Sequence, residues 1–349
     1  MRQFKFGSAL LITLILVGCG GGGSDVASKP KFKSQVSFGD SLSDVGSYRV
    51  STLGSPTADV GEFTINAASG VATNWTELTA PKFGLAEPCA AVVGGFGVPR
   101  APALNTPSTT GCYGYAQGGS RVTDPSGVGF GTGPMTEPVV TQIVNYLRDV
   151  GGSFKGNEIV FVMAGANDVF VQAAQVSGGL SAASGVQAVQ TAASQLATAV
   201  KTQIIANGAK YVVVVNVPDI ASTPYVTLIV DPTIRAQTGG LLDLLVKTFN
   251  AQLKADLPDS ATVLNVDAYA ASKDEVANPG KYNLSNVTLT ACYLPLTTSS
   301  SLTCNANNLN TGVLPTDHYL FADTVHPTPY GHSLFALDVL QAMTNKGWY

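Results

Sequence analysis

The segment Tyr211-Val212-Val213-Val214-Val215-Asn216 contains four consecutive valines. Such an uninterrupted β-branched run is typical of a strand buried on both faces of a parallel sheet, because a half-exposed strand alternates apolar and polar residues. Three more short apolar runs predict strands at 35–38, 158–163 and 262–266. Stretches with helical character separate these strands, at 139–150, 185–206, 239–255 and 333–345. Strands that alternate with helices predict an α/β fold, a three-layer α/β/α sandwich with a mostly parallel central sheet.

Length and composition predict a single folded domain. The chain has 349 residues, of which 45% are hydrophobic and 12% charged, so it can bury a large core. We see no internal repeat and no second domain, and we expect a monomer. The Gly-rich stretch at 51–135 is predicted to form loops around a functional site. The net charge is -4 and the basic residues are scattered, which argues against a nucleic-acid partner.

The first residues have the features of an export signal. Arg2 and Lys5 precede an apolar run at 9–17, which is too short to span a hydrocarbon layer about 30 Å thick. The run ends in Leu16-Val17-Gly18-Cys19, which resembles the lipobox of bacterial lipoproteins. The resemblance implies a signal peptide at 1–18, a lipidated Cys19 that anchors the chain to a membrane, a flexible tether at 19–33 and a folded domain at 34–349. The alternative is an ordinary signal peptide with an incidental cysteine.

The residues after Cys19 favour one membrane of a bacterial envelope. They begin Gly20-Gly21-Gly22-Gly23. Glycines at these positions do not resemble an inner-membrane retention signal. We therefore expect an exported lipoprotein anchored to the outer membrane.

Beyond Cys19 the chain has an even number of cysteines, which suits disulfide bonding in an oxidising compartment. They are Cys89, Cys112, Cys292 and Cys304. Three pairings are possible, and the simplest joins neighbours in sequence, Cys89 with Cys112 and Cys292 with Cys304. The chain has no Cys-x-x-Cys or His-Glu-x-x-His spacing, so we expect no metal site.

Polar residues follow the predicted strands, where a parallel sheet presents its carboxyl ends to ligands. Ser41 follows the first strand in Phe38-Gly39-Asp40-Ser41-Leu42-Ser43-Asp44, Asn167 follows the second and Asp219 the third. Asp323 and His326 precede the last helix in Asp323-Thr324-Val325-His326-Pro327. A serine, a histidine and a carboxylate supply the nucleophile, the general base and the group that orients the base in acyl transfer.

The order of these motifs resembles that of the GDSL lipases and esterases, also called SGNH hydrolases, over about residues 34–346. The resemblance implies a flavodoxin-like α/β/α fold and a serine ester hydrolase that needs no metal or organic cofactor. It implies that Ser41 is the nucleophile, that His326 is the base and that Asp323 holds the base. It also implies an oxyanion hole made by the backbone N–H groups of Ser41 and Gly119 and the side-chain amide of Asn167.

The match to the family has one open choice and two departures. Gly119 lies in Tyr115-Ala116-Gln117-Gly118-Gly119-Ser120, where Gly118 is the alternative for the oxyanion hole. Ser47 and Gly114 stand where family members often have asparagine. Those asparagines help to brace the loops, so the shape of the oxyanion pocket stays open at this point.

Two other residues and one other fold are alternatives for the same chemistry. Ser43 is the alternative nucleophile and His318, beside Asp317, the alternative base, whereas His332 is predicted in or near the last helix. A conventional α/β-hydrolase would require a Gly-x-Ser-x-Gly elbow, which this chain lacks.

The sequence therefore predicts a secreted serine hydrolase that acts on lipid or other acyl esters. Two alternatives stay open: a polysaccharide O-deacetylase of the same fold, and a non-catalytic lipoprotein that binds glycans or envelope components. Acyl-chain specificity is expected to depend on the loops at 51–135 and 285–316.

Overall fold

The computed structural model describes residues 29–51, 60–68, 71–95, 98–102, 111–129, 136–296 and 300–349. The predicted signal peptide at 1–18, the predicted lipidation site Cys19 and the tether as far as residue 28 lie outside the described residues. No helix in the described ranges combines the length and the apolar character that a membrane span requires.

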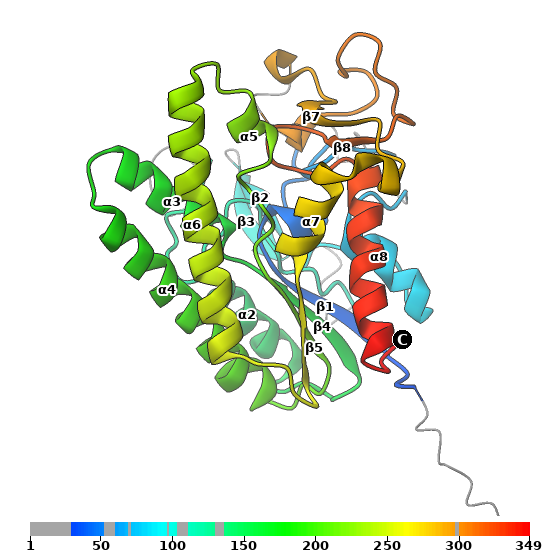
Figure 1. Cartoon of the computed structure of the whole chain (residues 1–349). Coiled ribbons are helices and arrows are strands. Elements are labelled where there is room, and N and C mark those ends of the chain that lie inside the picture. The colour runs from blue at the N-terminus through cyan, green and yellow to red at the C-terminus, as the bar shows by residue number, and fades with distance from the viewer. Residues whose placement is uncertain are drawn as a thin grey trace, which may run out of the picture.

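Four parallel strands form the central sheet, as predicted. They are β1 (Ser34–Gly39), β4 (Glu158–Met163), β5 (Val212–Val215) and β6 (Val263–Val266), in the order β1-β4-β5-β6. Val160 pairs with Val36 on one side and with Val212 on the other, and Val212 pairs with Val263. The four strands therefore run in one direction and end at one edge of the sheet (Figure 1).

Both faces of the sheet are covered, which explains the uninterrupted apolar strands. Val160 and Val162 of β4 belong to one buried cluster, whereas Ile159, Phe161 and Met163 belong to a second cluster on the opposite face. Successive side chains of a strand point to opposite faces, so each strand must be apolar at every position. The two clusters confirm the predicted three-layer α/β/α sandwich.

Six longer helices and two short ones, α1 (Trp75–Thr79) and α5 (Pro224–Thr227), surround the sheet in the described part of the chain (Figure 1). The first cluster contains side chains of α2 (Val139–Val150), α3 (Ala166–Ser177), α4 (Ala182–Ala199) and α6 (Pro232–Asp256). The second contains side chains of α1, α7 (Ala268–Ala277) and α8 (Pro329–Asn345). The short helix α5 precedes α6, and a π-helical turn, Val200–Ile205, continues α4.

The predicted helices are present, but three of them begin earlier than expected. The helix predicted at 185–206 begins at Ala182, where the Ser181 side chain accepts a hydrogen bond from the Ser184 amide. The helix predicted at 239–255 begins at Pro232, capped by Asp231, and the helix predicted at 333–345 begins at Pro329. The helices α1, α3, α5 and α7 were not predicted.

A segment of the 51–135 region extends the sheet beyond β1. The Ser37 amide donates to the Tyr113 carbonyl, the Tyr115 amide donates to the Ser37 carbonyl, and the Gln117 amide donates to the Gly39 carbonyl. Residues 113–117 thus lie along the free edge of β1, on the side opposite β4. This course leads the chain directly to the carboxyl end of β1, where the next residues are the two glycines of the predicted oxyanion block.

Shorter elements complete the described chain. β2 (Val92–Gly95) and β3 (Val98–Pro102) form an antiparallel pair, and β7 (Asn286–Thr290) pairs in parallel with β8 (Tyr319–Phe321). Short 3₁₀ helices lie at Ser41–Ser43, Ala80–Phe83, Pro279–Tyr282, Leu294–Leu296 and Ser301–Thr303.

The two disulfides are the sequence-local pairs that we expected. Cys89 is bonded to Cys112, and Cys292 is bonded to Cys304. The first closes a loop of 23 positions and the second a loop of 12. The first loop contains the antiparallel pair β2–β3, and the second contains the 3₁₀ helices Leu294–Leu296 and Ser301–Thr303.

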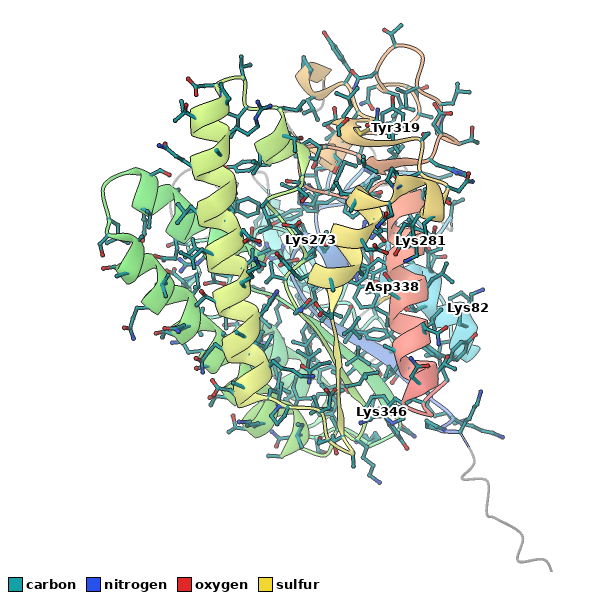
Figure 2. The ribbon with its side chains drawn as sticks, in the orientation of Figure 1. Lys82, Lys273, Lys281, Tyr319, Asp338 and Lys346 are labelled. Carbon is teal, nitrogen blue, oxygen red and sulfur yellow. A yellow bond between two sulfur atoms is a disulfide. The ribbon has the colours of Figure 1, made fainter. Side chains whose placement is uncertain are left out.

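Charged side chains gather where α7 meets α8 and the 3₁₀ helix that follows α7. Lys281 forms an ion pair with Asp274, and Asp338 projects from α8 toward the same region (Figure 2). Glu275 is buried nearby, and burial raises its pKa to about 8, helped by repulsion from Asp338 and Asp274. This carboxyl group is therefore protonated at neutral pH in the folded protein.

Candidate active site

Ser41 lies directly after β1, in the first position of the 3₁₀ helix Ser41–Ser43. The buried Asp40 side chain caps this turn by accepting a hydrogen bond from the Leu42 amide at 3.1 Å. A side chain at Gly39 could not fit, because a Cβ atom there would lie 2.3 Å from the Met163 carbonyl oxygen. The tight junction of β1 and β4 thus turns the chain and places Ser41 at the edge of the sheet.

The predicted serine, histidine and aspartate form one hydrogen-bonded chain. The Oγ atom of Ser41 is 2.8 Å from Nε2 of His326, and Nδ1 of His326 is 2.7 Å from Oδ2 of Asp323. The contact between Ser41 and His326 joins residues that are 285 positions apart in sequence. The arrangement can remove the hydroxyl proton from Ser41 as its oxygen attacks a carbonyl carbon.

The Asp323 carboxylate is buried, and both of its oxygens accept hydrogen bonds. Its Oδ1 accepts from the backbone amides of Val325 and His326, and its Oδ2 accepts from the Ser301 amide as well as from the imidazole. Burial alone would raise the pKa of Asp323, but the neighbouring His326 and the hydrogen bonds outweigh it, so the pKa is lowered to about 2. Asp323 is therefore ionised across the neutral range and can stabilise an imidazolium.

The alternative nucleophile and bases are placed elsewhere. Ser43 is fully buried, and its Oγ accepts a hydrogen bond from the indole of Trp75. His318 stacks on Tyr330, and its Nδ1 contacts Asn283. Neither residue takes part in the hydrogen-bonded chain that joins Ser41, His326 and Asp323.

His332 lies in the first turn of α8 and is fully buried. Burial lowers its pKa to about 3, so the ring stays neutral. As predicted, His332 belongs to the last helix.

Gly118 and Gly119 are held from both sides at the end of the segment that flanks β1. The Gly118 amide donates to Oδ2 of Asp44 at 2.8 Å, and the Gly118 carbonyl accepts from the Tyr48 hydroxyl at 2.7 Å. The bond from Tyr48 fixes the plane of the Gly118–Gly119 peptide and hence the direction of the Gly119 N–H. Gly119 has a φ of +82°, a conformation that favours glycine.

Gly118 must be glycine for a different reason, which is steric. A Cβ atom at Gly118 would lie 2.1 Å from the ring of Phe63. Its own amide is already engaged by Asp44, so Gly119 is the glycine whose N–H is available to an oxyanion.

The two departures from the family pattern are accommodated locally. Ser47 donates from both its amide and its hydroxyl to Asp44, each at 2.7 Å. The serine therefore braces the same carboxylate that holds Gly118. At Gly114 there is no room for an asparagine, because a Cβ atom would lie 2.6 Å from Val45 and 2.9 Å from the Cys89 carbonyl oxygen.

Asn167 lies in the first turn of α3, one residue after the helix begins. Its Nδ2 donates to the Ser120 carbonyl at 2.9 Å, which uses one of the two amide hydrogens. Gly165 precedes the helix with a φ of +115°, and a Cβ atom there would lie 2.3 Å from Phe249. This turn delivers the amide of Asn167 to the same edge of the sheet as Ser41.

A cavity of about 720 Å³ opens at this edge and is lined by Ser41, Gly119, Asn167 and His326. All predicted oxyanion residues therefore face one space together with the base. Most of the other lining side chains are apolar, and they include Phe170, Val171, Ala174, Ile220, Tyr225 and Val325. Loops of the 51–135 and 285–316 regions also contribute, through Phe63, Val128 and Leu302.

Asp219, in the loop that follows β5, also lines this cavity, but its carboxylate is engaged in its own turn. Its carboxylate accepts from the Ala221 amide at 3.1 Å and from the Ser222 hydroxyl at 2.6 Å. It holds the loop that carries Ile220, so the structure gives it a place in the wall and no contact with Ser41 or His326.

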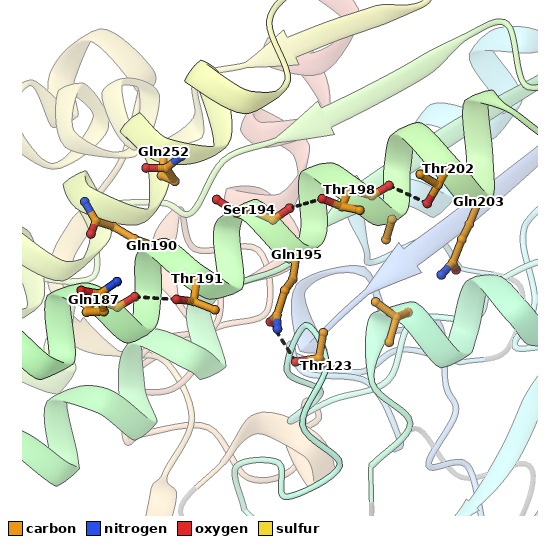
Figure 3. A pocket seen from close by; sticks show the side chains of 12 residues that line it. Thr123, Gln187, Gln190, Thr191, Ser194, Gln195, Thr198, Thr202, Gln203 and Gln252 are labelled. Carbon is orange, nitrogen blue, oxygen red and sulfur yellow. Dashed lines mark hydrogen bonds between the residues drawn. The ribbon is translucent and has the colours of Figure 1, made fainter.

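A second concavity, of about 540 Å³, lies on the outer helical layer and shares no residue with the first (Figure 3). Glutamine, serine and threonine side chains of α4 form most of its lining. The hydroxyls of Thr191, Thr198 and Thr202 donate to backbone carbonyls one turn earlier, and Gln195 accepts from Thr123. The residues that line this groove include no histidine, cysteine or carboxylate that could act as a base or nucleophile.

Three supporting residues were not identified from the sequence: Tyr48, Phe63 and Ser301. The Phe63 ring lies 4.9 Å from the His326 ring, centroid to centroid, and Ser301 donates to Asp323. No motif signalled any of them. In the described ranges, no group of three or more His, Cys, Asp or Glu side chains could hold a metal ion.

Known proteins resemble this chain in their solved structures and in a family sequence model. Among solved structures, an acetyl xylan esterase from Geobacillus stearothermophilus covers 90% of this chain and 97% of its own, with 13% identity and a TM-score of 0.40. An extracellular lipase from Streptomyces rimosus covers 88% and 98%, with 14% identity and a TM-score of 0.42. Nothing about the substrate follows from likeness this low.

No curated protein sequence matches the chain. The family model described as GDSL-like Lipase/Acylhydrolase, in contrast, matches residues 36–339, which span every element of the site described above. The chain belongs to the GDSL-like lipase/acylhydrolase family and is a hydrolase of ester bonds.

Proposed function

We propose that the protein cleaves carboxylic esters through an acyl-enzyme on Ser41. The observation that carries this proposal is the chain from Ser41 Oγ to His326 Nε2, at 2.8 Å, and from His326 Nδ1 to Asp323, at 2.7 Å. The chain ends at the cavity that holds the predicted oxyanion donors. Nucleophile, base and donors thus surround one space in which an ester carbonyl can sit.

In the first half of the reaction, Ser41 Oγ attacks the carbonyl carbon while its proton passes to Nε2 of His326. Asp323 stabilises the resulting imidazolium. The oxyanion accepts hydrogen bonds from the backbone N–H groups of Ser41 and Gly119 and from the free amide hydrogen of Asn167. The tetrahedral intermediate then breaks the bond to the alcohol oxygen, which takes the proton from His326 and leaves.

In the second half, water takes the place of the alcohol. His326 removes a proton from the water as its oxygen attacks the acyl carbon. The second tetrahedral intermediate releases the acid, and Ser41 regains the proton from His326. No metal or organic cofactor takes part in the proposed steps.

The walls of the cavity favour an acyl chain longer than acetyl. Phe170, Val171 and Ala174 of α3 line it together with Ile220 and Tyr225, and the volume of about 720 Å³ is typical of sites for whole small molecules. An acetyl group would leave these side chains without contact. Each methylene that they cover contributes up to about 0.8 kcal/mol, or roughly fourfold in kcat/KM.

A panel of p-nitrophenyl esters from C2 to C16 tests the proposed preference. We expect kcat/KM to rise from acetate through butyrate to about octanoate. A maximum at acetate, with strong activity on acetylated polysaccharide, would replace the acyl-ester proposal by that of an O-deacetylase.

A pair of variants on α3 tests where the chain binds. Ala174→Phe fills the cavity wall and should lower octanoate hydrolysis at least tenfold more than acetate hydrolysis. Gln175→Phe adds the same bulk at an exposed position of the same helix and should change neither. Equal losses for both esters in Ala174→Phe would place the acyl chain elsewhere.

We also propose that the protein is exported and anchored by lipid at Cys19. The two disulfides support an oxidising compartment. Cys19→Ala should move the protein from the outer-membrane fraction to the soluble fraction without a change in specific activity. Intact mass measurement of the native protein should find a lipid on Cys19, and an unmodified N-terminus would contradict the proposal.

A further inference from the structure

The hydrogen bonds of Asp323 divide into local ones and one from a distant segment. The amides of Val325 and His326 belong to the same turn as the carboxylate and bind Oδ1. Oδ2, the oxygen that faces the imidazole, also accepts from the Ser301 amide at 2.6 Å, across 22 positions of sequence. The Ser301 N–H therefore fixes the oxygen that orients the base.

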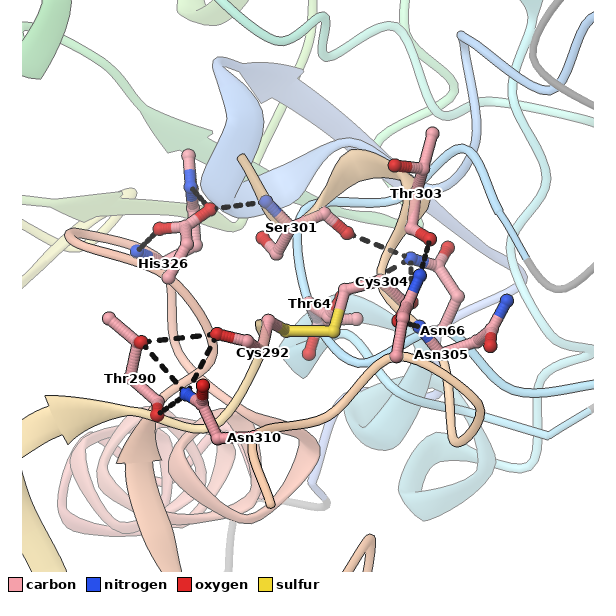
Figure 4. Close-up of a disulfide and its surroundings, with 12 residues drawn as sticks. Thr64, Asn66, Thr290, Cys292, Ser301, Thr303, Cys304, Asn305, Asn310 and His326 are labelled. Atoms are coloured by element: carbon pink, nitrogen blue, oxygen red, sulfur yellow. Dashed lines mark hydrogen bonds and ion pairs between the residues drawn. A yellow bond between two sulfur atoms is a disulfide. The ribbon is translucent and has the colours of Figure 1, made fainter. Parts of the chain in front are cut away.

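Ser301 is held by a network outside the catalytic residues (Figure 4). It follows Cys292 and precedes Cys304, so the disulfide closes the loop that carries it. The side-chain amide of Asn66 donates to the Ser301 carbonyl at 3.1 Å and to the Cys304 carbonyl at 2.9 Å. The Ser301 N–H can therefore move little relative to Cys304 and Asn66.

A second segment of this network, residues 60–68, also reaches the base His326. Asn66 lies in the segment 60–68, whose Gly61 amide donates to the Leu302 carbonyl at 2.8 Å. Phe63 of the same segment packs its ring against His326. The two segments, joined to each other, thus contact both the carboxylate and the imidazole.

We propose that the backbone amide of Ser301, held in place by the Cys292–Cys304 disulfide and by Asn66, is a positioning group for Asp323. The proposal rests on the proposed function, in which Asp323 orients His326. Without this donor, Oδ2 keeps a single partner, and the carboxylate can rotate away from the geometry that holds the imidazole toward Ser41. A hydrogen bond to an ionised group is also stronger than a neutral one, so its loss should be measurable.

The amide and the hydroxyl of Ser301 can be tested separately. Ser301→Pro removes the N–H at the first position of a 3₁₀ helix, a position that tolerates proline. Ser301→Ala keeps the N–H and removes a hydroxyl that has no hydrogen-bond partner among the described residues. We expect Ser301→Pro to lower kcat/KM for p-nitrophenyl butyrate about tenfold and Ser301→Ala to change it less than twofold.

Ser301→Pro and Ser301→Ala, each combined with Asp323→Ala, distinguish a positioning role of the Ser301 amide from a general disturbance of the fold. If Ser301 acts through Asp323, Ser301→Pro should have less than a twofold further effect on the residual activity of Asp323→Ala. A tenfold loss in both backgrounds would overturn the inference and leave the proposed function intact. Full activity of Asp323→Ala alone would instead refute the role of Asp323 in the proposed mechanism.

The disulfide offers an independent test that does not require proline. The double variant Cys292→Ser with Cys304→Ser should lose severalfold in kcat/KM, again without effect in the Asp323→Ala background. The matched control removes Cys89–Cys112, which lies near the amino ends of β1 and β4, and should change kcat/KM less than twofold. Circular dichroism at the assay temperature checks that each variant is folded. Equal losses for the two disulfides would contradict the proposal.

Discussion

Asn167→Ala tests the oxyanion hole through its one side-chain donor. The Nδ2 group spends one hydrogen on the Ser120 carbonyl, so the second hydrogen is the one that faces the cavity. Loss of one such donor costs about 2.7–4 kcal/mol of barrier, which is roughly 10²–10³ in kcat. The variant also loses the hydrogen bond from Asn167 to the Ser120 carbonyl. Both groups are uncharged, so this loss should lower the free energy of unfolding by only about 1 kcal/mol. Catalysis should therefore fall far more than stability.

The assay is steady-state hydrolysis of p-nitrophenyl butyrate, with urea unfolding of the same preparation. KM should stay within about threefold, because the donor acts on the oxyanion and little on the ground-state ester. Gln175→Ala, an exposed change on the same helix, serves as the control and should match the native protein. A loss in kcat of less than about fivefold in a folded Asn167→Ala variant would refute the assignment.

Two further predictions concern the support of the glycine peptide and the buried carboxyl group. Tyr48→Phe removes the hydroxyl that donates to the Gly118 carbonyl, so kcat should fall about tenfold with little change in KM. Unchanged kinetics would show that the direction of the Gly119 N–H does not depend on this hydrogen bond. Glu275→Gln should flatten the pH dependence of stability in urea unfolding. Burial raises the pKa of Glu275 to about 8 from 4.5, so the folded state keeps a proton that the unfolded state releases. At about 1.4 kcal/mol per pKa unit, the native protein therefore loses on the order of 5 kcal/mol of its free energy of unfolding as pH rises through that window. The same pH slope in native and variant protein would contradict this.

The sheet could be predicted because its strands carry a strong local signal. β4 was predicted with its observed bounds, and β5 lies within the predicted segment, since burial on both faces requires apolar residues at every position. The helix α2 was also predicted with its observed bounds. In these segments, local pattern and tertiary environment agree.

The missed helix boundaries have a common physical origin. Gly239–Gly240 suggested a helix start, yet α6 runs through these glycines from Pro232, because Asp231 caps it and its apolar face packs in the core. Asp231 followed by Pro232 is a sequence pattern that predicts a helix start at this position. The start of α3 was not readable in the same way, since Gly165-Ala166-Asn167-Asp168 has the composition of a turn. The helix begins after Gly165, whose positive φ and close approach to Phe249 require glycine, and neither feature can be read from a turn-like composition.

The motif residues of the site could be identified, whereas the residues that hold them could not. Ser41, Asn167 and His326 lie in short segments whose spacing carries the family pattern. Tyr48 and Ser301 act through a hydroxyl and a backbone amide that reach the site across long sequence separations. Such contacts depend on how loops meet in three dimensions, and no local pattern encodes them.

The most direct test of the account is to locate the serine that reacts with a fluorophosphonate. Peptide mass spectrometry of the labelled protein should find one adduct, on Ser41. The adduct should be lost in His326→Ala, because the reaction needs the imidazole that lies 2.8 Å from the Ser41 oxygen. Labelling of His318→Ala should be unchanged. An adduct on Ser43, or an unlabelled Ser41 in a preparation that still hydrolyses esters, would contradict the central claim.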